Sequence, residues 1–446
     1  MLRHRPFSLV FVLFLLAFSV STGSAAAEVQ SLTLSQAVQL ARQRNPDLLM
    51  MKNQVATAAE SLRLKETALQ PSLDLNISAS ERFTESSVTV DGKSDAIASS
   101  LNSSLNLYRG GADLAGRRSA SFSLAADRYT LRRSEQTLLL TISSGYMQAL
   151  TDRALIVVEE ENVAVNRQLE ERISALVDAG VNPISDLYQQ QAATAQSRLN
   201  LLSAERNATV SRMQLLQAIG IMPDTEVDLK GPSAPQLFLT EITLPASGGT
   251  RPDLLATVEA QAAAQARIEQ AQAGRWPTID LTAALGSSYN SHSSGSFSNQ
   301  FSDDNRYASI GVSLNLPFFD RGQNRYSVAT AQIAAQNSRL DAEKLKLAVT
   351  GDIAQAEAEL RMVRQQVEVT TRQLQSAQEA WAAQSERYRV GASKLIEVTQ
   401  ARTSLVTAKY DEIKAHYALL TRSMALFQAR GDDAAMEALL NEWEKQ

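Results

Sequence analysis

The sequence contains no cysteine and only three histidines among its 446 residues. The lack of cysteine excludes a disulfide framework, a catalytic thiol and a lipid-attachment cysteine near the N-terminus. His4 falls in a segment expected to be removed, and His292 and His416 are far apart, so no histidine pair has metal-ligand spacing. Neither a phosphate-binding glycine loop nor a nucleophile elbow is present. The sequence therefore predicts a protein that is not an enzyme and that uses no cofactor and no metal.

Charge of one sign and long apolar runs are also scarce. The net charge is -5, and the basic residues are scattered along predicted helices, which argues against a nucleic-acid partner. The apolar run from Phe7 to Val20 is shorter than the roughly 20 residues of a membrane-spanning helix. Charged residues at 3–5 precede it and alanines at 25–27 follow it, so residues 1–27 match a signal peptide. The mature chain is expected to begin at Glu28 and to be exported to the cell envelope.

Proline is absent from two stretches that are long enough to form rods. The first runs from Gln323 to Val390 and has one interior glycine, Gly351. Its apolar and small residues alternate steps of four and three, as in a coiled-coil seam with one polar position, Thr370. The seam consists of Val349, Ile353, Ala356, Leu360, Val363, Val367, Thr370, Leu374, Ala377 and Trp381. Such a helix would be about 100 Å long, so it must pack against other long helices rather than inside a compact domain.

A second rod from Asp113 to Asp178 belongs to an internal repeat. Its apolar residues at mostly helical spacing are Leu155, Val158, Val165, Leu169, Ile173 and Leu176. The block Asn45-Pro46-Asp47-Leu48-Leu49 reappears about 206 residues later as Arg251-Pro252-Asp253-Leu254-Leu255. Three more blocks recur in the same order: Gln70–Leu75 as Trp276–Leu281, Ser104–Leu107 as Ser313–Leu316, and Gly180–Leu187 as Gly391–Val398. The chain is therefore predicted to be one unit written twice.

Each half also contains two stretches with a period of two. Apolar residues alternate with polar ones from Leu73 to Ala79, and again from Ile97 to Leu107 after a polar loop at 85–94. The second half repeats the pattern at 279–285 and 310–316, around a serine-rich loop at 287–304. Each stretch has about ten residues, the length of a tilted transmembrane strand.

Aromatic residues stand at the helix-side ends of these strands, where a membrane barrel carries an interfacial girdle. They are Tyr108, Trp276, Phe318 and Phe319. Four strands cannot close a barrel, because single-chain barrels start at about eight and an open edge in lipid leaves backbone groups unpaired. Several copies must share one barrel, in which two would supply about eight strands and three about twelve.

These features together resemble the TolC family of outer-membrane efflux proteins, over about Ser31 to Gly431. They are the two Pro-Asp-Leu-Leu blocks, the hairpins after Pro71 and Pro277, and the two glycine turns with their flanking residues. The resemblance implies a mixed fold of α-helix and transmembrane β-sheet. A homotrimer would share a twelve-stranded barrel, four strands from each chain, and continue as a long helical coiled-coil barrel across the periplasm.

The resemblance also implies a function and its partners. The trimer would be a passive exit duct in the outer membrane, embedded in its lipid, for a tripartite efflux pump or a type I secretion system. It would meet a periplasmic adaptor (membrane fusion) protein and, through it, an inner-membrane pump of the RND, ABC or MFS type. Two other classes of envelope protein also contain long helices. A periplasmic adaptor would need a compact β-rich domain, and none is indicated between Ile221 and Thr250, whereas a structural coiled-coil protein would not need paired strands.

The family pattern assigns roles to individual residues. The polar strand face that lines the lumen would carry Asp74, Asn106, Asp280 and Asn315, and the periplasmic tip that meets the adaptor would carry Gly180, Val181, Gly391 and Ala392. The gate at the tip would use Asp186 with Tyr388 as a polar link and Glu397 in an acidic ring. The chain departs from the pattern at Ser393, in place of an arginine, and at Gln400, in place of a second acid. Lys394 would replace the missing cation.

Simpler roles compete with these assignments. Asp186 is equally explained as a helix N-cap, Tyr388 as a packing residue and Glu397 as one of many solvated charges. A glycine that stops a helix in the left-handed conformation would explain Gly180 and Gly391.

The expected boundaries follow the repeat. They are a signal peptide at 1–27, a first repeat at 28–220, an equatorial crossing segment at 221–250, a second repeat at 251–430 and a C-terminal equatorial segment at 431–446. Within the repeats, hairpins are expected at about 71–108 and 277–317, long helices at about 113–178 and 323–390, and return helices at about 186–219 and 395–429.

Overall fold

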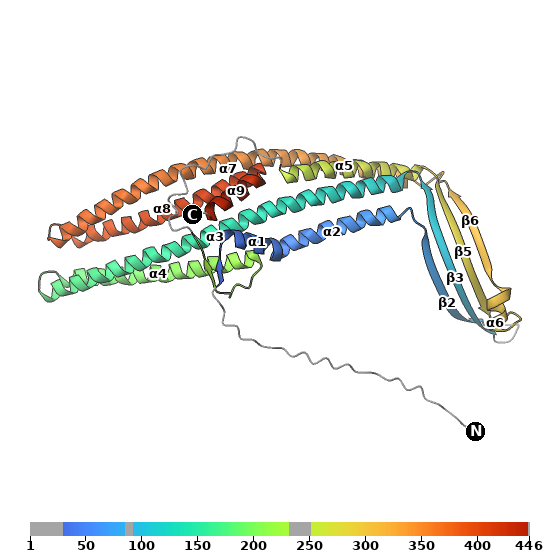
Figure 1. Ribbon diagram of the computed structural model, residues 1–446, viewed down its shortest axis with the longest axis horizontal. Coiled ribbons are helices and arrows are strands. Elements are labelled where there is room, and N and C mark those ends of the chain that lie inside the picture. The colour runs from blue at the N-terminus through green and yellow to red at the C-terminus, as the bar shows by residue number, and fades with distance from the viewer. Residues whose placement is uncertain (1–29, 85–91, 232–250, 445–446) are drawn as a thin grey trace, which may run out of the picture.

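The computed structural model describes residues 30–84, 92–231 and 251–444. The molecule is a long, narrow layer of helices that ends in a sheet, and the sheet turns away from the direction of the helices (Figure 1). Two helices run through most of the layer, α3 (Ala112–Asp178) and α7 (Gln323–Arg389), and each has 67 residues. At 1.5 Å per residue each is about 100 Å long. The rods predicted from the proline-free stretches are therefore present as single helices.

Each element of the first half has a counterpart in the second. Helix α2 (Pro46–Thr67) corresponds to α5 (Pro252–Gln272), β2 (Ser72–Thr84) to β5 (Thr278–Asn290), β3 (Gly92–Arg109) to β6 (Tyr307–Asn315), and α4 (Ile184–Ile219) to α8 (Leu395–Arg430). Helices α4 and α8 have 36 residues each. Both end at a glycine with positive φ, Gly220 at 87° and Gly431 at 73°. The predicted internal repeat is confirmed element by element.

Each repeated Pro-Asp-Leu-Leu block is preceded by a polar residue, Asn45 or Arg251. The side chain of this residue is hydrogen-bonded to the end of the return helix in the same half of the chain. Asn45 caps α2, and its amide also donates to the carbonyl of Ala218 at 2.8 Å. In the second half Arg251 holds the carboxylate of Asp253 at 2.7 Å and lies 3.4 Å from the carbonyl of Ala429, to which it donates. The two side chains differ, but they join equivalent elements.

The described helices form one layer that is four helices wide. Beside the sheet the order is α2, α3, α5, α7, and in the half farther from the sheet it is α4, α3, α8, α7 (Figure 1). Helices α3 and α7 thus pass through both halves, while α4 continues the line of α2 and α8 that of α5. One edge of the layer is α7, and the other is α2 together with α4.

The sheet is antiparallel, with the order β2-β3-β5-β6. Its strands have 13, 18, 13 and 9 residues, so three are longer than the ten that the alternation predicted. Strand β3 begins at Gly92, inside the predicted polar loop, and β5 extends to Asn290, inside the serine-rich one. The ladder continues through these polar residues because 92–95 of β3 pair with 81–84 of β2, and the end of β5 at Asn290 pairs with Ala96 of β3. The rest of the serine-rich loop holds two short turns, α6 (Phe297–Asn299) and η3 (Gln300–Asp304).

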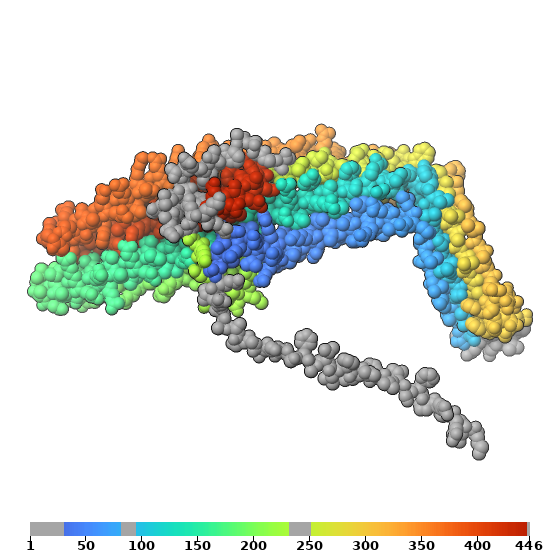
Figure 2. All heavy atoms as spheres, viewed as in Figure 1, coloured from blue at the N-terminus to red at the C-terminus, as the bar shows by residue number. Residues whose placement is uncertain are grey.

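An apolar core occupies the middle of the molecule. There α1 (Leu34–Arg44) and α9 (Asp433–Glu444) pack on α3 and α8, and Figure 2 shows α9, in red, beside the blue N-terminal helices. Strand β1 (Gln30–Leu32) pairs in parallel with β4 (Val227–Leu229) across the same region. The core is built from Ile142, Tyr146, Met147, Leu150, Leu215, Leu420, Met424, Phe427 and Trp443, among others. This core fixes the two halves of the chain against each other.

The coiled-coil seam predicted on α7 faces α8. Leu360 and Val363 form a buried cluster with Leu419 and Leu426 of α8. Thr370, the polar position of the seam, is also buried, and its hydroxyl donates to the carbonyl of Gln366 at 2.9 Å, which satisfies the group inside the helix. The polar position therefore does not interrupt the rod.

Some predicted segments lie outside the described residues. These are the signal peptide at 1–27 and residues 232–250 of the crossing segment. Of the helices within the described ranges, none is both long and apolar enough to pass through a bilayer.

Candidate functional site

The turns that follow α3 and α7 lie at the end of the molecule farthest from the sheet (Figure 1). Gly180 (φ 72°) and Gly391 (φ 77°) are in the left-handed conformation, and the N–H groups of Val181 and Ala392 donate back to carbonyls of the preceding helix at 2.8 and 2.7 Å. A Cβ added at either glycine would meet nothing within 4 Å, so backbone conformation, and not lack of space, requires glycine. Val181, in contrast, is 69% exposed.

A cavity of about 640 Å³ between these turns brings together Asp186, Tyr388 and Lys394 from the predicted gate. Asp186 and Tyr388 share one polar neighbour. The amide of Asn182 donates to Oδ2 of Asp186 at 3.3 Å and to the hydroxyl of Tyr388 at 3.4 Å. The link between the two hairpins at the tip therefore passes through Asn182, which the sequence analysis missed. Its only signal was a side-chain amide between the glycine turn and Pro183.

The tyrosine of this link keeps its proton at neutral pH. Burial raises the pKa of the Tyr388 hydroxyl, the hydrogen bond from Asn182 lowers it, and the negative charge of Asp186 raises it again, so the pKa lies above its ordinary value. The hydroxyl therefore remains a donor as well as an acceptor.

Asp186 is not the N-cap of the return helix. Pro183 occupies that position with an extended backbone (φ -74°, ψ 150°), and α4 begins at Ile184. The N-cap explanation is therefore wrong, because the fixed φ of proline suits the start of a helix and places that start before Asp186. Asp186 lies in the first turn, where its negative charge still interacts favourably with the helix dipole.

The other two predicted gate residues differ in their surroundings. Lys394 occupies the N-cap position of α8 and lines the cavity. Glu397 lies in the first turn of α8 and is exposed. Ser393, where the family resemblance led us to expect an arginine, donates its hydroxyl to the carbonyl of Gln384 at 3.4 Å. The cation available at the cavity is thus Lys394, together with the neighbouring Arg172 and Arg389.

At the other end of the molecule, strand register places the four predicted lumen residues on one face of the sheet. Asn106 pairs with Asp280, and Asn315 pairs with the residue two positions before Asp280. Asp74 pairs with Asn102, four positions before Asn106 on β3, so it shares that face. The opposite face carries Leu73, Leu75, Ile77, Ile310, Val312 and Leu314, which are 64% to 79% exposed. The sheet thus has one polar and one apolar face, both uncovered in a single chain.

The predicted aromatic residues lie where the sheet joins the helices. Tyr108 is the last residue but one of β3, Trp276 precedes β5, and Phe318 and Phe319 follow β6. All four side chains are exposed, Phe318 and Phe319 almost completely.

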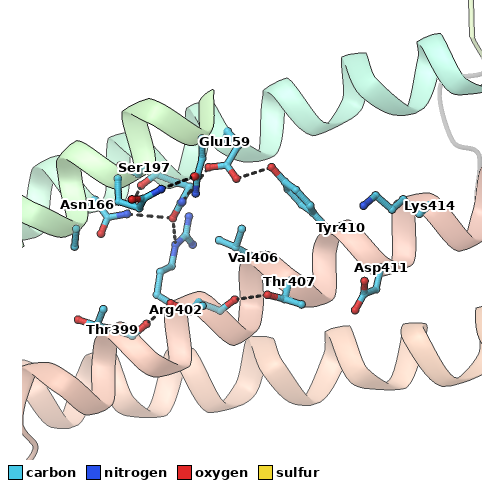
Figure 3. Close-up of a pocket in the computed structure, with 15 residues that line it drawn as sticks. Glu159, Asn166, Ser197, Thr399, Arg402, Val406, Thr407, Tyr410, Asp411 and Lys414 are labelled. Carbon is cyan, nitrogen blue, oxygen red and sulfur yellow. Dashed lines mark hydrogen bonds between the residues drawn. The ribbon is translucent and has the colours of Figure 1, made fainter. Parts of the chain in front are cut away.

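A second polar cluster lies between α3 and α8, farther from the tip. Figure 3 shows Arg402 pointing from α8 toward α3 and α4. Its Nε donates to Oδ1 of Asn162 at 3.2 Å, its Nη1 lies 3.7 Å from the Glu161 carboxylate, and its guanidinium lies 5.4 Å from the ring centroid of Trp381 on α7. Arg402 therefore meets both neighbouring helices.

The same cluster buries a carboxylate. Glu159 accepts hydrogen bonds from the hydroxyl of Tyr410 (Figure 3) and from the amide of Asn162. Burial raises the pKa of the Tyr410 hydroxyl, and the hydrogen bond to Glu159 raises it further, so Tyr410 stays a donor. Asn166 extends the network from Asn162 to Gln190 of α4.

The sequence analysis missed this cluster too, although the sequence carries a signal for it. Arg402, Lys409, His416 and Ser423 recur every seven residues along α8. Side chains seven residues apart form one row along a helix, and a row that packs against a neighbouring helix is normally apolar. A polar row on a buried helix face therefore indicates side chains that need partners on a neighbouring helix.

Comparison with known proteins bears on the family and the fold of the chain. Residues 37–221 and 247–432 each match the family model described as outer membrane efflux protein. The chain is 26% identical over 412 residues to protein CyaE of Bordetella pertussis, covering 91% of this chain and 85% of that protein. It is 26% identical to the pyoverdine export outer membrane protein OpmQ of Pseudomonas aeruginosa, over 89% and 85% of the two chains. It is 24% identical to the outer membrane protein TolC of Escherichia coli, over 94% and 85%.

Solved structures show the same fold. The outer membrane protein VceC of Vibrio cholerae superposes with a TM-score of 0.74 at 21% identity, over 89% of this chain and 96% of that one. The CmeC outer membrane channel of Campylobacter jejuni gives 0.74 at 18% identity, over 92% and 89%. The two family matches fall on the two repeats, and these likenesses extend over nearly the whole chain, so the predicted family resemblance and the predicted mixed fold are confirmed.

Proposed function

This chain belongs to the outer membrane efflux protein family, and from that premise we propose that three copies close into one duct that crosses the outer membrane and the periplasm. The chain is an outer-membrane exit duct for efflux, like the proteins of that family. The observation that carries the trimer is that the sheet and the helix layer each have two open edges, and that the edges lie on matching sides of the molecule.

The sheet edges demand a partner. Among the described strands β2 pairs with β3 alone, and β6 pairs with β5 alone. An edge of unpaired N–H and C=O groups is not tolerated in hydrocarbon. If β6 of one copy pairs with β2 of the next, the contact is head-to-tail, and such contacts form a ring when the rotation from copy to copy closes. Three copies bring about twelve strands, which falls within the range of known membrane barrels.

The two edges of the helix layer also expose apolar side chains. On α7, Tyr326, Ile333, Leu340 and Leu347 recur every seven residues and are 53% to 77% exposed. Beside the sheet the opposite edge is α2, which exposes Met50 and Leu64. In the farther half α7 exposes Met362 and Val369, and the opposite edge is α4, which exposes apolar residues that include Leu199 and Leu202. Seven-residue spacing is that of a coiled-coil seam. The copies that close the barrel would therefore also bury these residues of α7 against α2 and α4 of the next copy and close the tube.

The two faces of the sheet suit the proposed barrel. Its apolar face would meet outer-membrane lipid, and its polar face, with Asp74, Asn106, Asp280 and Asn315, would line the lumen. The exposed aromatic residues at the sheet–helix junction would lie at the membrane–water interface, where aromatic girdles are found.

The tip fits a contact with other proteins of an export system. We assign Gly180, Val181, Gly391 and Ala392 to contact with a periplasmic adaptor, which would join the duct to an inner-membrane pump of the RND, ABC or MFS type. Transport energy would come from that pump, so the duct itself needs no catalytic residue. The gate residues Asp186, Tyr388 and Lys394 lie at the same end, around the cavity of about 640 Å³.

Mass measurement tests the assembly. We expect the mature protein, extracted in detergent, to have three times the chain mass by light scattering corrected for detergent. A monomer of undiminished thermal stability would refute the shared barrel, because its four strands would then stand alone in the membrane.

A pair of matched variants tests the adaptor contact. Val181→Glu places a charge on an exposed tip residue without changing the helix stop, and Val157→Glu makes the same change on α3 at a residue of similar exposure, 62% against 69%. We expect Val181→Glu to abolish export while the trimer still reaches the outer membrane, and Val157→Glu to export normally. Normal export by Val181→Glu would reduce the turns to helix stops.

A further inference from the structure

The contact between the two helical hairpins, α3–α4 and α7–α8, changes in character along its length. In the middle of the molecule α8 contributes Tyr417, Leu420 and Met424 to the apolar core. Between this core and the buried Leu395 at the tip, the row of α8 that faces the neighbouring helices is polar, with Arg402 and His416 both buried. Separating apolar side chains exposes their surface to water, which is unfavourable, whereas polar side chains that separate can form hydrogen bonds with water instead of with each other. The polar part is therefore where the hairpins can part, and the apolar core is where they stay joined.

Within this row, Arg402 is a buried charge whose loss of hydration is poorly compensated by its ion-pair and hydrogen-bond partners. Its side chain is 7% exposed, whereas that of its ionic partner Glu161 is 49% exposed and also binds Lys409. The Nη1 atom of Arg402 is buried and has no hydrogen-bond partner among the described residues. Its distance of 3.7 Å from Glu161 is long for a buried ion pair. Burial lowers the pKa of Arg402, and the charges of Glu161 and Glu159 do not fully reverse the effect.

We propose that Arg402 is a positioning residue that favours separation of the two hairpins at the tip, because separation returns its guanidinium to water. The proposal rests on the duct function argued above. Taking an ion out of water costs more than a partly exposed partner at this distance restores. Arg402 therefore opposes the Asn182 link, which holds the hairpins together, and the two interactions set the balance between a closed and an open tip.

A latch would predict the opposite. If Arg402 held the hairpins together, removing its charge and removing that of its partner would both open the tip. If Arg402 drives separation, the two changes act in opposite directions. Arg402→Met keeps the side-chain volume and removes the buried charge, and Glu161 keeps Lys409 as a partner. Glu161→Gln leaves Arg402 buried with still less compensation.

The experiment uses the full chain with two introduced spin labels. Because the protein has no native cysteine, Ala175→Cys on α3 and Gln400→Cys on α8, both at exposed positions, can be labelled specifically. Dilution with unlabelled chain restricts the measured distance to one copy, so the reading does not depend on the trimer, whose mass is measured separately. The control is Arg422→Met, on the same helix, which removes a half-exposed arginine paired to Glu359 at 3.0 Å.

The proposal fixes the direction of each result. We expect Arg402→Met to reduce the fraction of the longer distance about tenfold, Glu161→Gln to increase it, and Arg422→Met to leave it unchanged. A longer or unchanged distance in Arg402→Met, or a shorter one in Glu161→Gln, would overturn the proposal while leaving the duct function intact. A monomeric mass would instead count against the duct.

Discussion

Replacing Asn182 with alanine should open the tip about as much as Tyr388→Phe, and more than Asp186→Ala. Asn182 makes one hydrogen bond within its own hairpin, to Asp186 at 3.3 Å, and one to the other hairpin, to Tyr388 at 3.4 Å. The bond between the hairpins is long, so it is given the low end of the usual range, about 0.5 kcal/mol. One chain then loses about 0.5 kcal/mol and three symmetric chains about 1.5 kcal/mol, which shifts the open-to-closed ratio on the order of tenfold.

The two partner variants differ in what they remove. Tyr388→Phe breaks the same bond between the hairpins and should shift the ratio about tenfold, whereas Asp186→Ala breaks only the bond within one hairpin and should shift it less. Single-channel conductance in planar bilayers measures the open-to-closed ratio, and the mass of each variant in detergent shows whether it is still assembled. If Tyr388→Phe and Asp186→Ala open the channel while Asn182→Ala does not, the bridge through Asn182 is not the closing interaction. The gate would then be a direct Asp186–Tyr388 contact between neighbouring helices, as the sequence alone suggested.

Two further predictions concern the middle of the molecule, where Arg251 meets Asp253. Burial by itself would raise the pKa of Asp253, but hydrogen bonds from Arg251 and the charges of Arg251 and Arg133 lower it below its ordinary value. The ionised Asp253 should therefore stabilise the fold above about pH 4, and this stabilisation should be lost as pH falls through the depressed pKa. Wild type and Asp253→Asn should accordingly differ in thermal midpoint at pH 7 and converge in acid. Gly431→Ala should lower the thermal midpoint more than Gly391→Ala does. Both glycines have positive φ, which costs an alanine about 1–2 kcal/mol. A Cβ at Gly431 would also lie 2.8 Å from the Cα of Arg251, whereas a Cβ at Gly391 would meet nothing within 4 Å. Equal midpoints for the two alanine variants would show that the close approach to Arg251 can relax.

Features that depend on local periodicity were predicted well. The four-three spacing around Leu360 identified the seam that packs against α8, and the period of two placed Leu73 and Ile310 on the apolar face of the sheet. Both patterns express geometry within one helix or one strand, 3.6 and 2 residues per repeat, and need no knowledge of the partner. The repeat itself was visible because equivalent positions, such as Asn45 and Arg251, begin equivalent helices.

Features that depend on which elements meet were not predicted. The role of Asn182 arises because two turns about 210 residues apart in sequence face each other across one cavity. The start of β3 at Gly92 depends on its pairing with Thr84 of β2, so the polar composition of this stretch did not reveal it. The burial of Arg402 depends on α3 and α7 covering it from two sides. In each case the missing information is tertiary, and the lumen and gate roles remain predictions until the assembled duct is measured.

The two interactions that bear on the tip act in opposite directions, and this leads to a last prediction. In each chain the Asn182–Tyr388 bond favours closure by about 0.5 kcal/mol, whereas replacing a poorly compensated buried charge by an apolar side chain is worth about 1–4 kcal/mol. The two clusters share no residue, so their effects should add approximately. The double variant Asn182→Ala with Arg402→Met should therefore have a conductance no higher than that of wild type, although Asn182→Ala alone raises it. A double variant as open as Asn182→Ala alone would show that Arg402 does not act on the same equilibrium.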